Sequence, residues 1–76
     1  MTIRVLLAED HKMVRQGTRL YLEGMGVEIV GEATTGREAV HLAQELHPDV
    51  VVMDIHMPEL TGIEATRRIR HEYPSI

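Results

Sequence analysis

The sequence predicts an α/β protein with a parallel sheet, because short apolar runs alternate with helical patterns along its 76 residues. The predicted strands span residues 3–8, 27–33 and 49–54, and a helical pattern follows each of them. Strands that alternate with helices are joined by right-handed crossovers, which make the strands parallel and cover both faces of the sheet. We therefore expect a β-α-β-α-β-α order in one doubly wound sheet.

The first strand and the first helix are predicted from hydrophobicity. Residues 3–8 read IRVLLA, a short apolar run typical of a strand that is buried on both faces. From His11 to Gly24 the apolar residues form a broad helical face, and glycine commonly ends a helix. The apolar residues of that face are Met13, Val14, Leu20, Tyr21 and Leu22.

Two capping boxes mark the expected starts of the second and third helices. Thr35 is followed three residues later by Glu38, and Thr61 by Glu64. In this pattern the hydroxyl accepts a bond from a backbone N–H, while the carboxylate reaches back to the start of the helix. Pro48 is expected to end the second helix.

The third strand, VVVM, is continuously apolar and runs directly into Asp54. A continuous apolar run, in place of an alternating one, is typical of a strand whose two faces both avoid water. We therefore expect this strand to be buried on both faces and to present a carboxylate at its end.

Three carboxylates are expected at one edge of the sheet. The first strand ends in Glu9 and Asp10 and the third in Asp54, and ligands of open parallel sheets bind beyond the carboxyl ends of the strands. A pair of like charges 4 Å apart costs roughly 4 kcal/mol at an effective dielectric of 20. Raised pKa values or a bound cation would offset this repulsion.

A site with only hard oxygen ligands suits Mg²⁺, which prefers a phosphate as a further partner. An aspartate oxygen beside the metal could attack a phosphoryl group, because the metal neutralises charge on the transferring oxygens. The alternative is that Asp10 merely caps the first helix and Asp54 the loop, since aspartate is a common capping residue.

These residues give the chain a resemblance to the receiver domain of two-component response regulators. The matching residues are Glu9-Asp10 after RVLLA, Asp54 after VVVM, Met57-Pro58 and Gly62. Two stretches, GEATTGREA at 31–39 and AEDHKMVRQG at 8–17, are similar to the NarL/FixJ branch, whose members usually carry a LuxR-type helix-turn-helix output domain.

The resemblance implies a flavodoxin-like fold with strand order 2-1-3-4-5. On this reading residues 1–76 are a receiver domain that is incomplete at the C-terminus, because the sequence stops before the family's fourth strand. The Ser or Thr and the Lys with which the family grips the phosphoryl oxygens would follow that point.

The resemblance also implies roles for four residues. Asp54 would be the phospho-acceptor and a Mg²⁺ ligand, Asp10 a direct Mg²⁺ ligand, and Glu9 an outer or water-mediated ligand. The backbone carbonyl of His56 would be a further metal ligand. Glu9 departs mildly from the family, which more often has aspartate there.

The function implied is that of a regulatory phosphoprotein and not of an enzyme. A histidine kinase would donate the phosphoryl group, and the full-length protein would control a DNA-binding transcriptional output. One alternative is an interaction or dimerisation module that does not switch. Another is an aspartate-dependent phosphatase, which would want a second aspartate where His56 stands.

The composition of the chain excludes some kinds of functional site and argues against others. The chain has no cysteine, which excludes disulfides and thiolate sites, and its net charge of −4 argues against phosphate-backbone binding by these residues. With no long apolar segment and no basic leader, we expect a soluble cytoplasmic protein with no membrane contact. The far edge of the VVVM strand would lack a partner, so we also expect a homo-oligomer.

Overall fold

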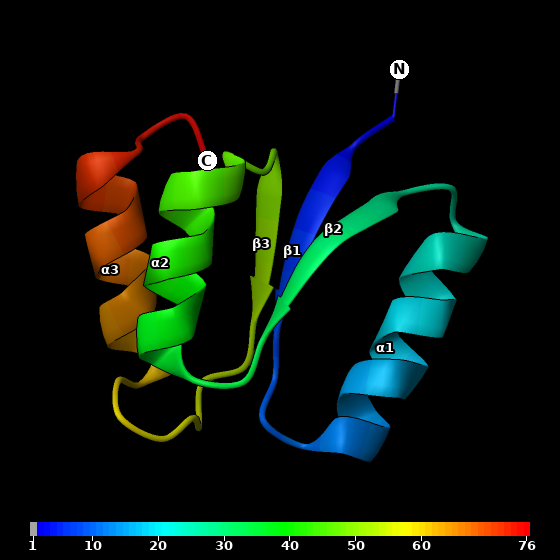
Figure 1. Cartoon of the computed structure of the whole chain (residues 1–76), viewed down its shortest axis with the longest axis horizontal. Helices are drawn as coiled ribbons and strands as arrows, with labels where there is room; N and C mark the ends of the chain where they lie inside the picture. Colours follow the sequence, from blue (N-terminus) through cyan, green and yellow to red (C-terminus); the bar gives the residue numbers. More distant parts are fainter. Residues whose placement is uncertain (1) are drawn as a thin grey trace.

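The computed structural model describes residues 2–76 as three strands and three helices in strict alternation (Figure 1). The elements are β1 (Arg4–Ala8), α1 (Lys12–Gly24), β2 (Glu28–Ala33), α2 (Gly36–Leu46), β3 (Val50–Met53) and α3 (Gly62–Glu72). The predicted order is confirmed, and the boundaries differ from the expected ones by one or two residues at most of the element ends. None of the helices in this part of the chain is long and apolar enough to cross a membrane.

The sheet is parallel and has the order β2-β1-β3. In the register of the central strand, Leu7 lies opposite Glu32 of β2 and Val52 of β3. The expectation that the first and third strands are neighbours is therefore confirmed. Because β1 has a strand on each side, its residues Val5–Ala8 are at most 3% exposed.

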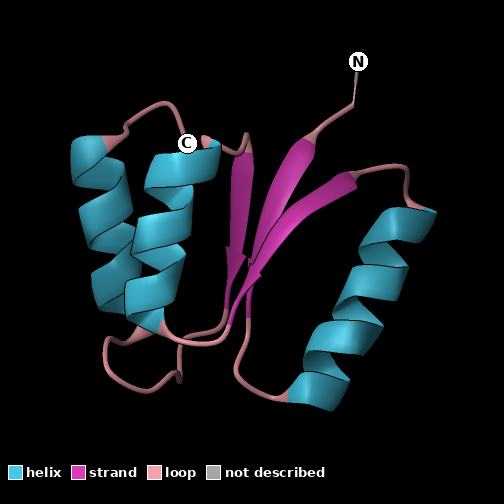
Figure 2. Ribbon diagram, viewed as in Figure 1, coloured by secondary structure: helices cyan, strands magenta, loops and turns pink. Residues whose placement is uncertain are grey.

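The helices are divided unequally between the two faces of the sheet. α2 and α3 lie side by side on one face, and α1 lies alone on the other (Figure 2). The core fills the space under the helix pair, where Leu6 of β1 packs with Ala43 of α2 and Ile69 of α3. A second buried cluster, around Ala8 and Met57, continues this core toward the carboxyl ends of the strands.

The expectation that neither face of the third strand meets water is wrong. Val50 is 44% exposed, and the other residues of β3 are only half-buried. Within the described residues β3 is an edge strand. The face of the sheet opposite α2 and α3 carries only α1, and α1 lies against β2 and β1 and leaves β3 uncovered. The strand that is buried on both faces is β1.

Both predicted N-caps are present. The Thr35 hydroxyl accepts from the Glu38 N–H at 3.0 Å, and the Glu38 carboxylate reaches back to the N–H of Thr34 at 2.7 Å. The Thr61 hydroxyl accepts from the Glu64 N–H at 3.2 Å and donates to the Glu64 carboxylate at the same distance. The two helices therefore start where their capping residues predicted.

Gly36 allows the start of α2 to touch the loop between β3 and α3. A Cβ atom at position 36 would lie 1.8 Å from the carbonyl oxygen of Leu60, which is a backbone atom of that loop. No side chain fits there without moving the loop. Gly36 thus fixes the position of the segment that follows Asp54.

We expect Gly36→Ala to lower the free energy of unfolding by about 1–3 kcal/mol, the usual cost of overpacking. Gly17→Ala is the matched control, because a Cβ in this α1 position meets nothing within 4 Å. The control should raise the free energy of unfolding by about 0.5–1 kcal/mol, since alanine loses less entropy than glycine in a helix. Urea denaturation followed by circular dichroism measures both; equal effects of the two substitutions would contradict the account of this contact.

Candidate functional site

The carboxyl ends of all three strands meet at one edge of the sheet. The Asp54 N–H donates to the carbonyl of Ala8 at 2.9 Å, and the Glu9 N–H donates to the carbonyl of Ala33 at 2.9 Å. Asp54 therefore sits directly beside the segment that carries Glu9 and Asp10. The structure brings the three acidic residues predicted from the sequence to the same edge.

Within that edge, the closest potential ligand atoms belong to three consecutive residues. Carboxylate oxygens of Glu9 and Asp10 and a ring nitrogen of His11 all lie within 4.8 Å of one another. His11 Nδ1 is 3.4 Å from Asp10 Oδ1 and 3.7 Å from Glu9 Oε2, although the His11 side chain is 78% exposed. Asp54 is not a member of this group among the described residues.

The hydrogen bonds distinguish the two acidic residues that follow β1. The Glu9 carboxylate accepts from the backbone N–H of His11 at 3.0 Å, at the start of α1. Asp10 Oδ1, in contrast, is buried and has no hydrogen-bond donor in residues 2–76. Asp10 therefore does not cap α1 through this oxygen.

A buried carboxylate oxygen without a donor costs free energy, because it has lost its water and gained no partner. The hydrogen bonds of the described residues also include none to the carboxylate of Asp54 or to the backbone carbonyl of His56. Oxygens with free lone pairs are what a hard cation such as Mg²⁺ requires. The donor set at this edge fits that metal.

The loop after Asp54 is held by close backbone contacts and two buried side chains. A Cβ atom on Gly62 would lie 1.9 Å from the carbonyl oxygen of Asp54, and the Gly62 N–H donates to the carbonyl of Ile55 at 2.9 Å. Met57 and Leu60 are 7% and 8% exposed and anchor the loop in the core. The start of α3 therefore presses against the backbone of Asp54, and only glycine permits this approach.

Arg15 lies beside the acidic site, and this position was not predicted from the sequence. From α1 it donates to the carbonyl oxygen of Glu9 through Nη1 and to the carboxylate of Glu32 through Nε, both at 3.0 Å. Arg19, one turn later, also bonds Glu32, and its pKa is raised by that hydrogen bond and by a second one to Glu23.

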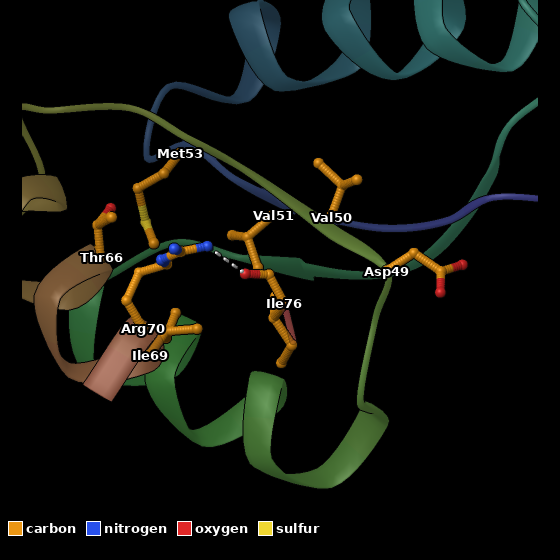
Figure 3. Close-up of a pocket in the computed structure, with 8 residues that line it drawn as sticks. All are labelled: Asp49, Val50, Val51, Met53, Thr66, Ile69, Arg70 and Ile76. Atoms are coloured by element: carbon orange, nitrogen blue, oxygen red, sulfur yellow. Dashed lines mark hydrogen bonds between the residues drawn. The ribbon is translucent and has the colours of Figure 1, made fainter. Parts of the chain in front are cut away.

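A pocket of about 190 Å³ lies elsewhere, between the outer edge of β3 and α3 (Figure 3). It is lined by Asp49, Val50, Val51, Met53, Thr66, Ile69, Arg70 and Ile76. Figure 3 shows Arg70 donating across it to the carbonyl of Ile76, at 3.2 Å. None of the acidic residues at the carboxyl ends of β1 and β3 lines this pocket, so it is not part of the acidic site.

Comparison with known proteins gives one consistent family. The profile described as "Response regulator receiver domain" matches residues 5–76. Response regulator protein VraR of Staphylococcus aureus is 46% identical over 77 aligned positions, which cover all of this chain and 37% of the relative. The chain thus spans little more than a third of the curated relatives that it matches.

Solved structures agree with this match. A two-component response regulator of the LuxR family from Aurantimonas sp. superposes with a TM-score of 0.93 and 43% identity, over 99% of this chain and 54% of that one. The response regulator domain of Thermotoga maritima CheB has a TM-score of 0.93 and 41% identity, over 99% and 57% of the two chains.

Proposed function

Since the chain belongs to the response regulator receiver domain family, we propose that it is the phospho-acceptor module of a two-component signalling system. The observation that supports this most strongly is that Asp10 and Asp54 lie at the same edge of the sheet, with a buried Asp10 oxygen that has no donor in the described chain. Such an arrangement suits a metal-assisted transfer to a carboxylate.

We propose that Asp54 is the acceptor. A carboxylate oxygen of Asp54 would attack the phosphorus of a phosphohistidine on a histidine kinase. An O–P bond forms, the P–N bond breaks, and the leaving imidazole keeps the electron pair and takes up a proton. The Asp54 carboxylate is available for this because none of the side-chain hydrogen bonds of the described residues involves it.

Asp10, Asp54, Glu9 and the backbone carbonyl of His56 would hold Mg²⁺. When bound, the metal supplies compensation for the negative charge on the transferring oxygens. The hydrogen bonds support a ranking of the acidic pair: the Glu9 carboxylate accepts from the His11 N–H, whereas Asp10 Oδ1 accepts no hydrogen bond from the described residues. Asp10 is therefore proposed as the direct ligand and Glu9 as an outer or water-mediated one.

The phosphoryl group on Asp54 would change the conformation of the domain and would not be released as the product of an enzymatic reaction. Aspartyl phosphate adds about one to two negative charges at Asp54, beside the segment that carries Glu9 and Asp10, enough to bias a two-state element. In the full-length protein, in the cytoplasm, this bias would control a DNA-binding output domain. The kinase and the output are inferences from the family.

We expect Asp54→Asn to abolish labelling of the full chain by a small-molecule phosphodonor with Mg²⁺, because the amide nitrogen replaces the attacking oxygen and the charge is lost. Asp49→Asn is the matched control, since it changes an exposed aspartate at the opposite end of the same strand. Mass spectrometry of the intact protein counts the added phosphoryl groups. Undiminished labelling of Asp54→Asn would refute the assignment.

We also propose that residues 1–76 associate through the outer edge of β3. In the part of the chain described, no strand pairs with that edge, and Val50 is 44% exposed beside the pocket of Figure 3. An unpaired apolar strand edge is a template for a second copy of the chain. Burial of its apolar surface adds a drive of roughly 25 cal/mol per Å².

Val50→Lys should therefore shift residues 1–76 toward the monomer in sedimentation equilibrium, because a charged side chain blunts an edge strand. Leu20→Lys, on the exposed surface of α1, should leave the association constant within about twofold of the parent. A parent chain that is monomeric at micromolar concentration would show the proposal of association to be wrong.

A further inference from the structure

α1 is attached to the sheet mainly through polar groups. None of its residues is buried, and its large side chains Met13, Leu20 and Tyr21 are 86%, 71% and 72% exposed. Two arginines one turn apart reach from α1 to the carboxylate of Glu32 in β2. These bonds, more than apolar burial, determine where the start of α1 lies relative to the acidic site.

The two arginines differ in their second acceptor. Arg15 also donates to the backbone carbonyl of Glu9, and its side chain is only 17% exposed. Arg19 instead completes its bonding within α1, with the carboxylate of Glu23 at 3.3 Å. Of the two, Arg15 is the residue that connects α1 and β2 to the acidic segment.

The carbonyl that Arg15 holds belongs to the peptide that joins Glu9 to Asp10. The N–H of Glu9 is held separately, by the carbonyl of Ala33 at 2.9 Å. Because a peptide group is planar, fixing these two groups fixes the direction in which the chain enters Asp10. Arg15 therefore holds the backbone that leads into Asp10, whose carboxylate carries the unpartnered oxygen.

We propose that Arg15 is a positioning residue of the acidic site, acting on Asp10 through the backbone of Glu9. This inference rests on the proposed function, in which Asp10 is a direct Mg²⁺ ligand. Mg²⁺ demands near-octahedral geometry, so a small rotation of one carboxylate weakens binding. Outer residues that orient metal ligands are typically worth about 10- to 100-fold in affinity.

Arginine suits this role because its planar fork supplies two N–H groups in fixed directions to Glu9 and Glu32 at once. A lysine ammonium is a single point of charge and cannot span both acceptors in the same way. The charge of Arg15 by itself has the opposite effect, since a cation near a metal site repels the metal. Loss of Arg15 should therefore weaken Mg²⁺ binding if Arg15 positions the ligand, and strengthen Mg²⁺ binding if its charge alone matters.

The test measures metal affinity in the full chain and its variants Arg15→Gln, Arg15→Lys and Arg19→Gln. Mn²⁺ followed by electron paramagnetic resonance serves as the probe, with displacement by Mg²⁺ giving the Mg²⁺ dissociation constant. We expect Arg15→Gln to raise that constant about tenfold. Arg15→Lys should raise it at least about threefold, because charge is kept while one of two bonds is lost.

Arg19→Gln is the matched control, because it removes a bond to the same Glu32 without touching the acidic segment. Its dissociation constant should stay within about twofold of the parent, even if urea denaturation shows a similar loss of stability in both variants. If Arg15→Gln lacks a cooperative unfolding transition, the Mg²⁺ dissociation constants of Arg15→Lys and Arg19→Lys are compared in its place. Arg15→Lys should then raise the constant, and Arg19→Lys should leave it within about twofold of the parent.

Arg15 variants that bind Mg²⁺ as tightly as the parent, or more tightly, overturn the positioning role while leaving the proposed function intact. A parent chain without saturable Mg²⁺ binding overturns the proposed function and this inference together. The parent titration therefore distinguishes the two failures.

Discussion

β1 is the most deeply buried element of the structure, and the other elements pack around it. Its residues Val5 to Ala8 are almost inaccessible to water, because β2 and β3 flank it and helices lie on both of its faces. Fully burying a side chain such as Leu6 or Leu7 is worth about 1.5–3 kcal/mol. A strand held this firmly in the centre delivers the residues that follow it, Glu9 and Asp10, to a fixed point at the sheet edge.

The position of the acidic site depends on β1 and on two glycines, Gly36 and Gly62, in the neighbouring segments. β3 pairs with β1 along its length, so Asp54 arrives beside Ala8. Gly36 and Gly62 then let α2 and α3 press against the loop that follows Asp54. The side chains of the site are polar and partly exposed, but the backbone that carries them is tied to the core.

On the opposite face of the sheet, ion pairs replace apolar burial as the contacts that hold the helix. α1 contributes no buried residue and is joined to β2 by the ion pairs of Arg15 and Arg19 with Glu32. Ion pairs that are partly exposed are individually weak and sensitive to salt. α1 thus depends on weaker contacts than α2 and α3, which bury residues in the core, and its start adjoins the acidic segment.

The sequence was sufficient to predict the features that depend on local patterns. Alternating strands and helices, the caps at Thr35 and Thr61, and the meeting of Asp10 with Asp54 at one edge all followed from residue order and spacing. The unpaired edge of β3 was expected from the resemblance, but the exposure of its faces was not, because a continuous apolar run is the same in a central and in an edge strand. Arg15 escaped detection for a similar reason: its two acceptors lie 6 and 17 residues away and meet it only in the folded chain.

We propose that Asp54 and the pair Glu9-Asp10 bind one cation together, although the Asp54 carboxylate lies outside the group formed by Glu9, Asp10 and His11. A Mg²⁺ titration of the ¹⁵N-labelled full chain, followed by NMR, tests this most directly. We expect saturable shifts of the backbone amides of residues 9–11 and 54–56 with one shared dissociation constant. Shifts confined to residues 9–11, or two different constants for the two segments, would contradict it.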